Sequence, residues 1–348
     1  MNPGAHPAEA PALRPATPSD PPGAPRRLLT RLPTPEQIAA LPRPPARRRL
    51  PKFLRSARAL ASTLRAGWLG GEGAGTAWRL QRLALTRMLR LDPSARKHLR
   101  ALYNFPLDSV RYFEAPFVRR ALRRAAGAGR LGSVADVSSP RSVILLALLD
   151  HPRLRIDAIN PDGADLRATA GLLRAAGPGL ARRATLRHAL AEASGLSPGS
   201  YDAVTSVSVY EHIRDERAAL EAAWDLLRPG GRLVLTLPCA REPFEEFFDR
   251  DDYGVQTPDA DGWYFGWRIY GPEDVRRRLV DRLGTPARAE YFGERQPGFF
   301  FRQRQAMLTG VGCRLWREPL TVAESYARFA RLEDLPGLGV MGLEFVKP

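Results

Sequence analysis

Short apolar runs alternate with segments of helical periodicity between residues 133 and 238. The apolar runs that indicate strands lie at 133–136, 154–160, 184–190, 201–209 and 232–238. Between them, segments such as 167–176 and 216–227 carry apolar residues three and four positions apart, which is typical of helices packed on one face. Strands separated by helices at this spacing form a parallel sheet that is covered on both faces. The sequence therefore predicts an α/β fold.

The turn after the first strand, Ser138-Ser139-Pro140-Arg141, contains no glycine. In a nucleotide-binding sheet, glycines normally fill this turn because they allow a tight bend and a close approach to the ligand. Ser139 is a good N-cap and Pro140 a preferred first helical residue, so we predict a helix that starts at Pro140. Its free N–H groups would face an anionic ligand above the strand. The alternative is that Ser139 caps the helix and does nothing more.

Residues 1–51 differ in composition from the rest of the chain. They hold 13 of the 32 prolines in positions before residue 51 and no aromatic residue, so they cannot bury enough surface to fold. We predict a disordered tail here that can be removed without loss of stability. A helical N-terminal extension is predicted for 52–107, with helices at 53–66 and 77–102. The aromatic segment 103–117 then either packs against the sheet or covers the site above it.

The net charge of +16 suggests nucleic-acid binding only at first sight. Up to residue 58 there are 11 basic residues and three acidic ones, so half of the excess lies in or beside the tail. No aromatic residue lies among the tail arginines to stack on bases. The tail is better suited to a weak contact with an anionic surface, and a specific nucleic-acid partner is not expected.

The two cysteines, Cys239 and Cys313, lie far apart and lack the spacing of a metal site. We therefore predict no disulfide framework and no bound metal. No window of the sequence reaches the apolar length of a membrane span, and no secretory signal is recognisable at the N-terminus. These features predict a soluble, cytoplasmic protein.

The segment "YDAVTSVSVYEHIRDERAALEAAWDLLRPGGRLVLTLP", residues 201–238, resembles the fourth-strand-to-fifth-strand block of class I S-adenosylmethionine-dependent methyltransferases of the type 11-like group. Asp202, the pair Glu211-His212 and the turn Pro229-Gly230-Gly231 stand where that family has them. The resemblance covers roughly residues 108–290, and "GVMGLEFVKP" at the C-terminus is similar to the family's last antiparallel strand. It implies a doubly wound, seven-stranded, mostly parallel Rossmann-like sheet in a domain spanning 108–348, with an insertion at 293–337.

The same resemblance implies that S-adenosylmethionine binds at the carboxyl ends of the first two strands. A serine hydroxyl of the first turn could replace glycine backbone contacts to the methionyl carboxylate, and the arginine there could add charge. At the ribose position the family's usual acid is replaced by Asn160, with Asp162 two residues on, although Asp162 is equally suited to an ordinary turn. After the third strand only His188 and Ala189 are available, so no side chain is assigned to adenine. The predicted cofactor-binding residues are Asp136, Ser138, Ser139, Arg141, Asn160, Asp162 and Ser206.

His212 is the predicted catalytic residue, because it follows the fourth strand at the edge where such sites open. The sulfonium of the cofactor already activates the methyl group, so the protein must mainly hold the acceptor in line and remove a proton. The alternative is that Glu211 and His212 only brace the next helix. Aromatic and acidic residues in 249–275, together with "PGFFFRQRQ", suit the walls of an acceptor site or the packing of a long loop.

The predicted function is methyl transfer from S-adenosylmethionine to an oxygen or nitrogen of a small polar molecule or glycan. Two alternatives stay open. The missing glycines and ribose acid favour a catalytically inactive methyltransferase-fold protein that acts as a binding or scaffold partner. A nucleic-acid methyltransferase is favoured by charge alone, and the chain lacks an Asn/Asp-Pro-Pro-aromatic motif after the fourth strand, where it has residues 206–209 instead.

Overall fold

The computed structural model describes residues 26–32, 34, 36–37, 52–89, 93–251, 256–308 and 318–348. Eight of the described strands form the central sheet, in the order β10-β9-β11-β6-β5-β2-β3-β4. Their bounds are β2 Ser133–Val137, β3 Arg155–Ile159, β4 Ala184–Arg187, β5 Tyr201–Val207, β6 Leu227–Cys239, β9 Arg288–Glu294, β10 Tyr326–Phe329 and β11 Gly339–Val346. From β4 to β6 neighbouring strands are parallel, whereas β11, β9 and β10 are antiparallel additions. The predicted doubly wound, mostly parallel sheet is confirmed.

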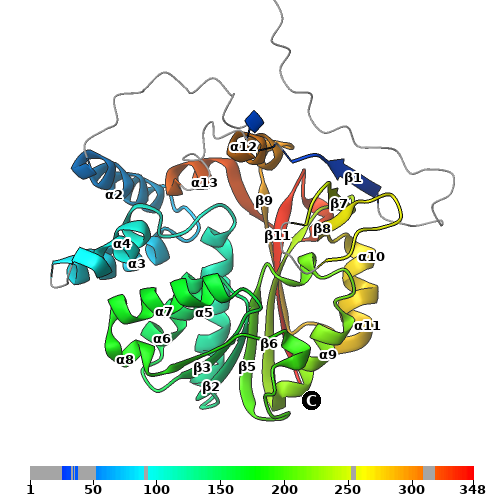
Figure 1. Ribbon diagram of the computed structural model, residues 1–348, viewed down its shortest axis with the longest axis horizontal. Coiled ribbons are helices and arrows are strands. Elements are labelled where there is room, and N and C mark those ends of the chain that lie inside the picture. The colour runs from blue at the N-terminus through cyan, green and yellow to red at the C-terminus, as the bar shows by residue number, and fades with distance from the viewer. Residues whose placement is uncertain are drawn as a thin grey trace, which may run out of the picture.

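Helices cover both faces of this sheet, because its strands are apolar on both sides. Val134 belongs to a core shared with α5 Arg111–Gly127, α6 Arg141–Asp150 and α7 Gly163–Ala176. Its neighbour Ala135 points to the opposite core, which includes α9 Arg217–Leu226. Figure 1 shows the two layers on either side of the sheet. The shorter helices are α8 Pro178–Ala181, η1 Ala191–Ala193, η2 Tyr210–His212, α10 Pro272–Asp274, the π-helix η3 Val275–Val280, α11 Asp281–Leu283 and η5 Leu332–Asp334.

The sheet has one strand more than predicted. The eighth strand, β10, comes from the predicted insertion at 293–337, which also contains α12 Phe299–Leu308 and α13 Pro319–Ser325. It pairs antiparallel with β9, from Tyr326 opposite Glu294 to Phe329 opposite Tyr291. This pairing satisfies backbone groups that β9 would otherwise expose at the sheet edge. The insertion therefore extends the sheet.

A second, three-stranded sheet has the order β1-β7-β8, with bounds Arg26–Thr30, Phe244–Phe248 and Tyr264–Ile269. Its first strand lies in the segment 1–51 that the sequence predicts to be disordered, so that prediction is wrong for residues 26–30. Leu28 is buried, and the hydroxyl of Thr30 donates a hydrogen bond to the buried carboxylate of Glu246 on β7. Five residues with two leucines are enough to pair with an existing strand, although their surroundings have the composition of a disordered tail. Most of the remaining tail lies outside the described residues.

Deletions at the N-terminus should therefore fall into two classes. Removing residues 1–24 should leave the melting temperature nearly unchanged, whereas removing residues 1–32 should lower it by several degrees. The longer deletion uncovers Phe247, over whose ring Arg27 lies at 4.2 Å, and takes a partner from Glu246. Thermal unfolding of the two deletions beside the full chain tests this. Equal melting temperatures for both would show that β1 adds nothing to stability.

The helical N-terminal extension consists of α2 Lys52–Trp68, α3 Ala74–Met88 and α4 Pro93–Asn104. The predicted helix at 53–66 is confirmed, but the single helix predicted at 77–102 is wrong, since a new helix begins at Pro93. Proline suits the first turn of a helix and not its interior, which explains the division. Figure 1 places these helices and the small sheet at the carboxyl edge of the central sheet.

The aromatic residues of 103–117 could either pack against the sheet or cover the site above it, and the structure supports packing. Tyr112, Phe113 and Phe117 are fully buried, and the ring of Phe113 stacks on those of Phe117 and Phe292 at 5.9 and 5.4 Å. Among the aromatic residues of 103–117 only Phe105 is exposed. These rings attach α5 and the helical extension to the antiparallel side of the sheet.

Candidate functional site

Serines hold left-handed backbone conformations at three points near the carboxyl edge of the sheet. Ser138 after β2, Ser208 after β5 and Ser109 before α5 have φ angles of 54°, 51° and 44°. Glycine normally occupies this region of backbone space, because side chains are strained there. Ser138 stays in place by donating hydrogen bonds from its N–H and its hydroxyl to the carbonyl of Ile159, at 2.8 and 3.2 Å. The turn after β2 thus has the backbone of a glycine loop, although its residue is serine.

The start of α6 differs from the prediction. The helix begins at Arg141, and its N-cap is Pro140, with no side chain capping the first turn. Ser139 is therefore not the cap. Its N–H donates to Oδ1 of Asp136 at 3.0 Å, and its buried hydroxyl has no hydrogen-bond partner in the described structure. The buried hydroxyl of Ser139 and the first N–H groups of α6 lie beside the end of β2, and both can donate hydrogen bonds to a ligand there.

Asp136 and Ser206 stabilise the turn at 138–140 through hydrogen bonds. The pairing of β2 with β5 sets Asp136 opposite Thr205, whose hydroxyl donates to Oδ2 of Asp136 at 2.5 Å. Burial raises the pKa of Asp136 to about 6. The hydroxyl of Ser206, equally buried, donates to the carbonyl of Val137 at 3.0 Å. Both side chains form hydrogen bonds with other groups of the protein, and these bonds fix the shape of the turn.

The residues predicted for the ribose form one network with the first turn. Asn160 accepts the N–H of Asp162 at 2.8 Å and donates to Asp165 at 3.2 Å. Asp162 caps α7 by accepting the N–H of Ala164 at 2.7 Å, as the turn alternative predicts. Arg141 pairs with Asp165 at 3.0 Å, which joins the ends of β2 and β3. Sequence reasoning missed Asp165, because the helix predicted at 167–176 begins at Gly163 in the structure, which puts Asp165 in its first turn.

A second polar cluster lies where β5 and β6 end. The buried carboxylate of Glu114 on α5 accepts the hydroxyls of Ser208 and Thr236 at 2.6 and 2.7 Å. Arg111, one helical turn before it, forms an ion pair with Glu114 and donates to the Ser208 hydroxyl at 2.6 Å. Little in the sequence indicates this cluster, because Glu114 is a single acid within an aromatic run.

Glu211 and His212 follow β5 on η2 and face this cluster. Burial raises the pKa of Glu211 to about 8, and its Oε2 accepts no hydrogen bond within the described structure. His212 is 33% exposed, and burial lowers its pKa below the ordinary value of 6.5. Its Nδ1 lies 2.9 Å from the carbonyl of Gly266, which can only accept, so Nδ1 carries the proton and Nε2 the lone pair. Nε2 is 3.9 Å from Oε1 of Glu211.

The raised pKa of Glu211 predicts a pH-dependent stability. In the native state this carboxyl stays protonated up to about pH 8, whereas in the unfolded chain it ionises near its ordinary value of 4.5. The native state therefore binds more protons between these values, and stability falls as pH rises, by at most about 1.4 kcal/mol per pH unit. Glu211→Gln keeps the neutral shape, so its melting temperature relative to wild type should rise from pH 5 to pH 8. A constant difference across that range would contradict the assignment.

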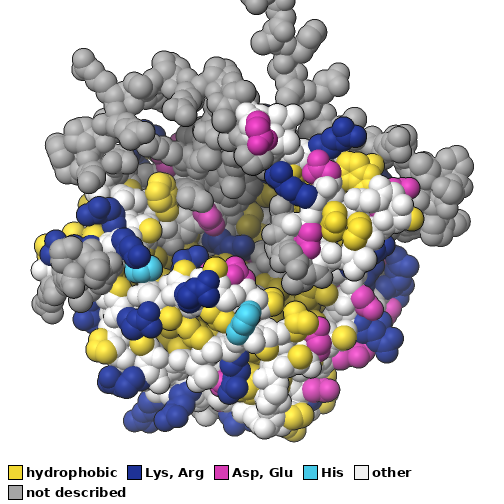
Figure 2. Space-filling model, in the orientation of Figure 1, with side chains coloured by type: hydrophobic (Ala, Val, Ile, Leu, Met, Phe, Trp, Pro, Cys, Tyr) yellow, Lys and Arg dark blue, Asp and Glu magenta, His cyan; other side chains and the backbone are white. Residues whose placement is uncertain are grey.

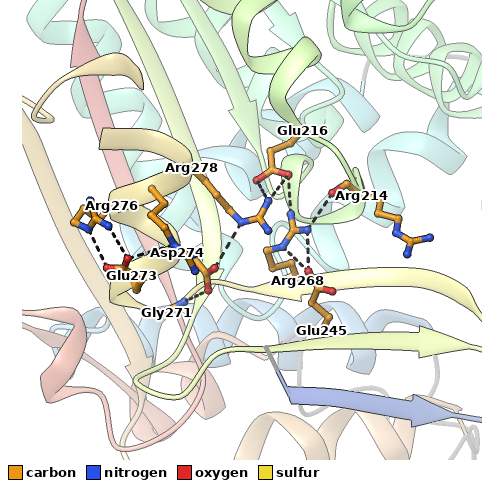
Figure 3. A network of polar contacts seen from close by, with 10 residues as sticks. Arg214, Glu216, Glu245, Arg268, Gly271, Glu273, Asp274, Arg276 and Arg278 are labelled. Carbon is orange, nitrogen blue, oxygen red and sulfur yellow. Dashed lines mark hydrogen bonds and ion pairs between the residues drawn. The ribbon is translucent and has the colours of Figure 1, made fainter. Parts of the chain in front are cut away.

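The small sheet holds the loop that carries His212. Besides the Gly266 carbonyl, β8 supplies Arg268, which is only 3% exposed and donates to the carbonyl of Arg214 at 3.0 Å. Arg268 also binds Glu216 at 2.7 Å and Glu245 at 2.8 Å, and Arg278 binds Glu216 from the other side at 3.1 Å (Figure 3). The network joins β8 to the residues just after η2.

The aromatic residues predicted as acceptor walls are partly structural. Phe265 and Tyr270 are buried, and the indole N–H of Trp267 donates to Glu246. In the "PGFFFRQRQ" segment, Phe300 packs on Trp267 with ring centroids 5.5 Å apart. Tyr253, in the same predicted wall, lies outside the described residues. Figure 2 shows a hollow on this face between the helical extension and the small sheet, with acidic and basic side chains at its floor.

Comparison with known families connects this geometry to a chemistry. Residues 137–233 match a family model described as a methyltransferase domain. This part of the chain is similar to a methyltransferase domain. The match begins at the last residue of β2 and ends in β6, so it includes the carboxyl ends of β2, β3 and β5. The cofactor that this domain implies is S-adenosylmethionine.

Several solved structures are similar in fold. They include a geranyl diphosphate C-methyltransferase from Streptomyces coelicolor A3(2), with 13% identity and a TM-score of 0.45, covering 74% of this chain and 84% of that one. The [4+2]-cyclase SpnF has 17% identity and a TM-score of 0.40, covering 66% and 82%. The MccD protein has 11% identity and a TM-score of 0.44, covering 67% and 98%. At this level of identity the similarity extends to the fold alone. A comparison with curated proteins found no match.

Within the residues that the structure describes, no helix is both long and apolar enough to cross a membrane. No group of three or more histidine, cysteine, aspartate or glutamate side chains in these parts of the chain could hold a metal ion.

Proposed function

We propose that this methyltransferase domain transfers the methyl group of S-adenosylmethionine to an oxygen or nitrogen of a small polar molecule or glycan, with His212 as the base. The observation that carries the proposal is the 2.9 Å hydrogen bond from Nδ1 of His212 to the Gly266 carbonyl, which leaves the lone pair of the neutral ring on Nε2. His212 follows β5 at the carboxyl edge of the sheet, and burial lowers its pKa, which favours the neutral ring. A neutral imidazole is the form that accepts a proton from a hydroxyl or ammonium group.

The residues at the end of β2 fit the implied cofactor. The left-handed turn at Ser138, the unpartnered hydroxyl of Ser139 and the uncapped start of α6 offer donors to a carboxylate. Asn160 and Asp162 lie at the end of β3, where the ribose would be held, while Arg141 adds positive charge. Asp136 and Ser206 support these groups through the hydrogen bonds described above. When bound, S-adenosylmethionine supplies an activated methyl group.

The acceptor side is assigned to the second cluster. Arg111 and Glu114 form an ion pair and Glu211 is neutral at pH 7, so this part of the site carries little net charge. A neutral polar acceptor fits such surroundings better than a polyanion does. His212, held by the small sheet, is the group of this cluster that can take up a proton as the acceptor oxygen or nitrogen attacks.

Two substitutions at Ser138 test the cofactor side. Ser138→Leu puts a bulky side chain into a left-handed turn and should weaken binding of S-adenosylmethionine at least tenfold, about 1.4 kcal/mol. Ser138→Gly restores the residue that this backbone favours and should retain the affinity. Calorimetric titration of both variants, with circular dichroism to confirm folding, separates the cases. Equal affinity of a folded Ser138→Leu variant would remove the turn from the site.

One observation favours a second candidate, a binding protein without catalysis. Both amide atoms of Asn160 are engaged by Asp162 and Asp165, and no acid stands at that position to accept ribose hydroxyls. Incubation with methyl-labelled S-adenosylmethionine and a panel of small hydroxylated, aminated and glycosylated acceptors distinguishes the two. Labelled product together with S-adenosylhomocysteine supports the enzyme. Cofactor binding without transfer to any acceptor in the panel favours the binding protein.

A further inference from the structure

The outer face of α2 carries an apolar stripe that no other described element covers. Ala57, Ala61, Leu64 and Trp68 follow each other at helical spacing, and all four are exposed. Trp68 is 90% exposed and Leu64 55%. The opposite face packs inward, where Ser62 accepts a hydrogen bond from the N–H of Leu320 in α13. In Figure 1, α2 is at the periphery of the molecule, with α13 on its inner side.

The neighbouring helix α3 repeats this pattern. Trp78, Leu85 and Leu89 lie on one of its faces and are all exposed, Leu89 by 77%. Exposed apolar side chains are common singly, but large ones repeated at helical spacing on two adjacent helices are typical of an interaction surface. We call the exposed apolar residues of these two helices the α2–α3 face: Ala57, Ala61, Leu64, Trp68, Trp78, Leu85 and Leu89.

The charges around the α2–α3 face select its partner. Residues 52–89 contain seven basic side chains and one acid, Glu72, which binds Arg120 and Arg328. Arg65 lies next to Leu64, and Arg82 lies between Trp78 and Leu85 on the same face of α3; both are exposed, and neither has an ion pair within the described structure. An apolar stripe with tryptophan and leucine, flanked by arginines without counterions, is suited to the boundary of an anionic bilayer.

A second copy of the chain fits this surface less well. With no acid on α2 or α3, two such faces would meet with like charges along both rims. A bilayer supplies the apolar layer and the negative charge together. We infer that the α2–α3 face docks the protein on an anionic membrane surface. Because these helices flank the carboxyl edge of the sheet, the membrane would lie on the same side of the molecule as the candidate site (Figure 1).

Vesicle sedimentation of the full chain tests the inference. The probes are vesicles of phosphatidylcholine alone and vesicles with about a third phosphatidylglycerol. The full chain should bind the anionic vesicles, bind the neutral ones at least tenfold more weakly, and lose affinity as salt is raised. The double variant Leu64→Ser, Trp68→Ser keeps every charge and should bind anionic vesicles at least tenfold more weakly than wild type. Leu190→Ser, at an exposed leucine on another part of the chain, is the matched control and should bind like wild type.

Two outcomes would overturn the inference. Wild-type binding by a folded Leu64→Ser, Trp68→Ser variant would assign any membrane contact to other basic residues, such as those of the N-terminal tail. The second outcome is that the wild-type chain binds neither kind of vesicle and sediments as a dimer, whereas the double variant sediments as a monomer. That result would make the face an interface between copies.

Discussion

Replacing His212 with glutamine should lower turnover by roughly 10² or more, the usual scale for loss of a general base, and leave the affinity for S-adenosylmethionine within a factor of about two. Glutamine is polar and close to histidine in size, but it has no nitrogen that takes a proton. Because the pKa of His212 lies below its ordinary value, wild-type turnover should be full at neutral pH and fall at acid pH. The measurement is turnover against pH with the acceptor found in the panel.

His151→Gln provides the control for this experiment. This histidine ends α6, at the opposite edge of the sheet from the candidate site, so its replacement should change turnover little. If His212→Gln instead lowers stability and cofactor affinity together with turnover, the histidine braces the helix, as the alternative interpretation holds. A variant with full turnover would rule out the base and leave positioning as the mechanism.

Arg268→Met should be the most destabilising change away from the core. The guanidinium is almost fully buried, and its removal leaves the buried carboxylate of Glu216 with Arg278 as its remaining ion-pair partner (Figure 3). Breaking a buried ion pair from one side costs about 3–5 kcal/mol, because the remaining charge stays desolvated. Turnover should fall as well, since the Arg214 carbonyl beside His212 loses its donor. Chemical denaturation with an unchanged m-value measures the stability part.

The same figure contains the matched control. Arg276 pairs with Glu273 at 2.6 Å and Asp281 at 2.9 Å, but all three side chains are exposed to solvent. Water and salt screen such pairs, so Arg276→Met should leave the melting temperature nearly unchanged. If the two variants were destabilised equally, burial would not be what makes the Arg268 network important.

The fold could be predicted from the sequence where the pattern is periodic and local. The five parallel strands and the last strand lie where apolar runs and the 201–238 resemblance place them. Two bounds differ: α7 begins at Gly163, before the helix predicted at 167–176, and β6 begins at Leu227, so it includes the predicted turn at 229–231. The strand β10 and all three strands of the small sheet, β1, β7 and β8, were missed. Short strands of this kind are stabilised by the partners they pair with and carry little signal of their own. The division of the helix at Pro93 was visible in the sequence but overlooked.

The candidate site was predictable in position and less so in detail. The turn at Ser138 and the pair after β5 stand at neighbouring strand ends, which the order of strands determines. The left-handed serines could not be foreseen, because serine rarely adopts that conformation. Glu114 acts from a helix more than 90 residues before its partner Ser208, and only the folded chain brings the two together. Asp202, singled out by the resemblance, accepts the N–H groups of Gly132 and Ser133 at the start of β2, away from the site.

Calorimetric titration of the wild-type chain with S-adenosylmethionine and S-adenosylhomocysteine tests the central claim most directly, because it requires no knowledge of the acceptor. The account predicts saturable binding of both compounds at one site per chain, with binding of S-adenosylmethionine weakened at least tenfold in Ser138→Leu and unchanged in His212→Gln. Absence of any binding heat and of any thermal stabilisation by either compound would contradict a methyltransferase site at the ends of β2 and β3.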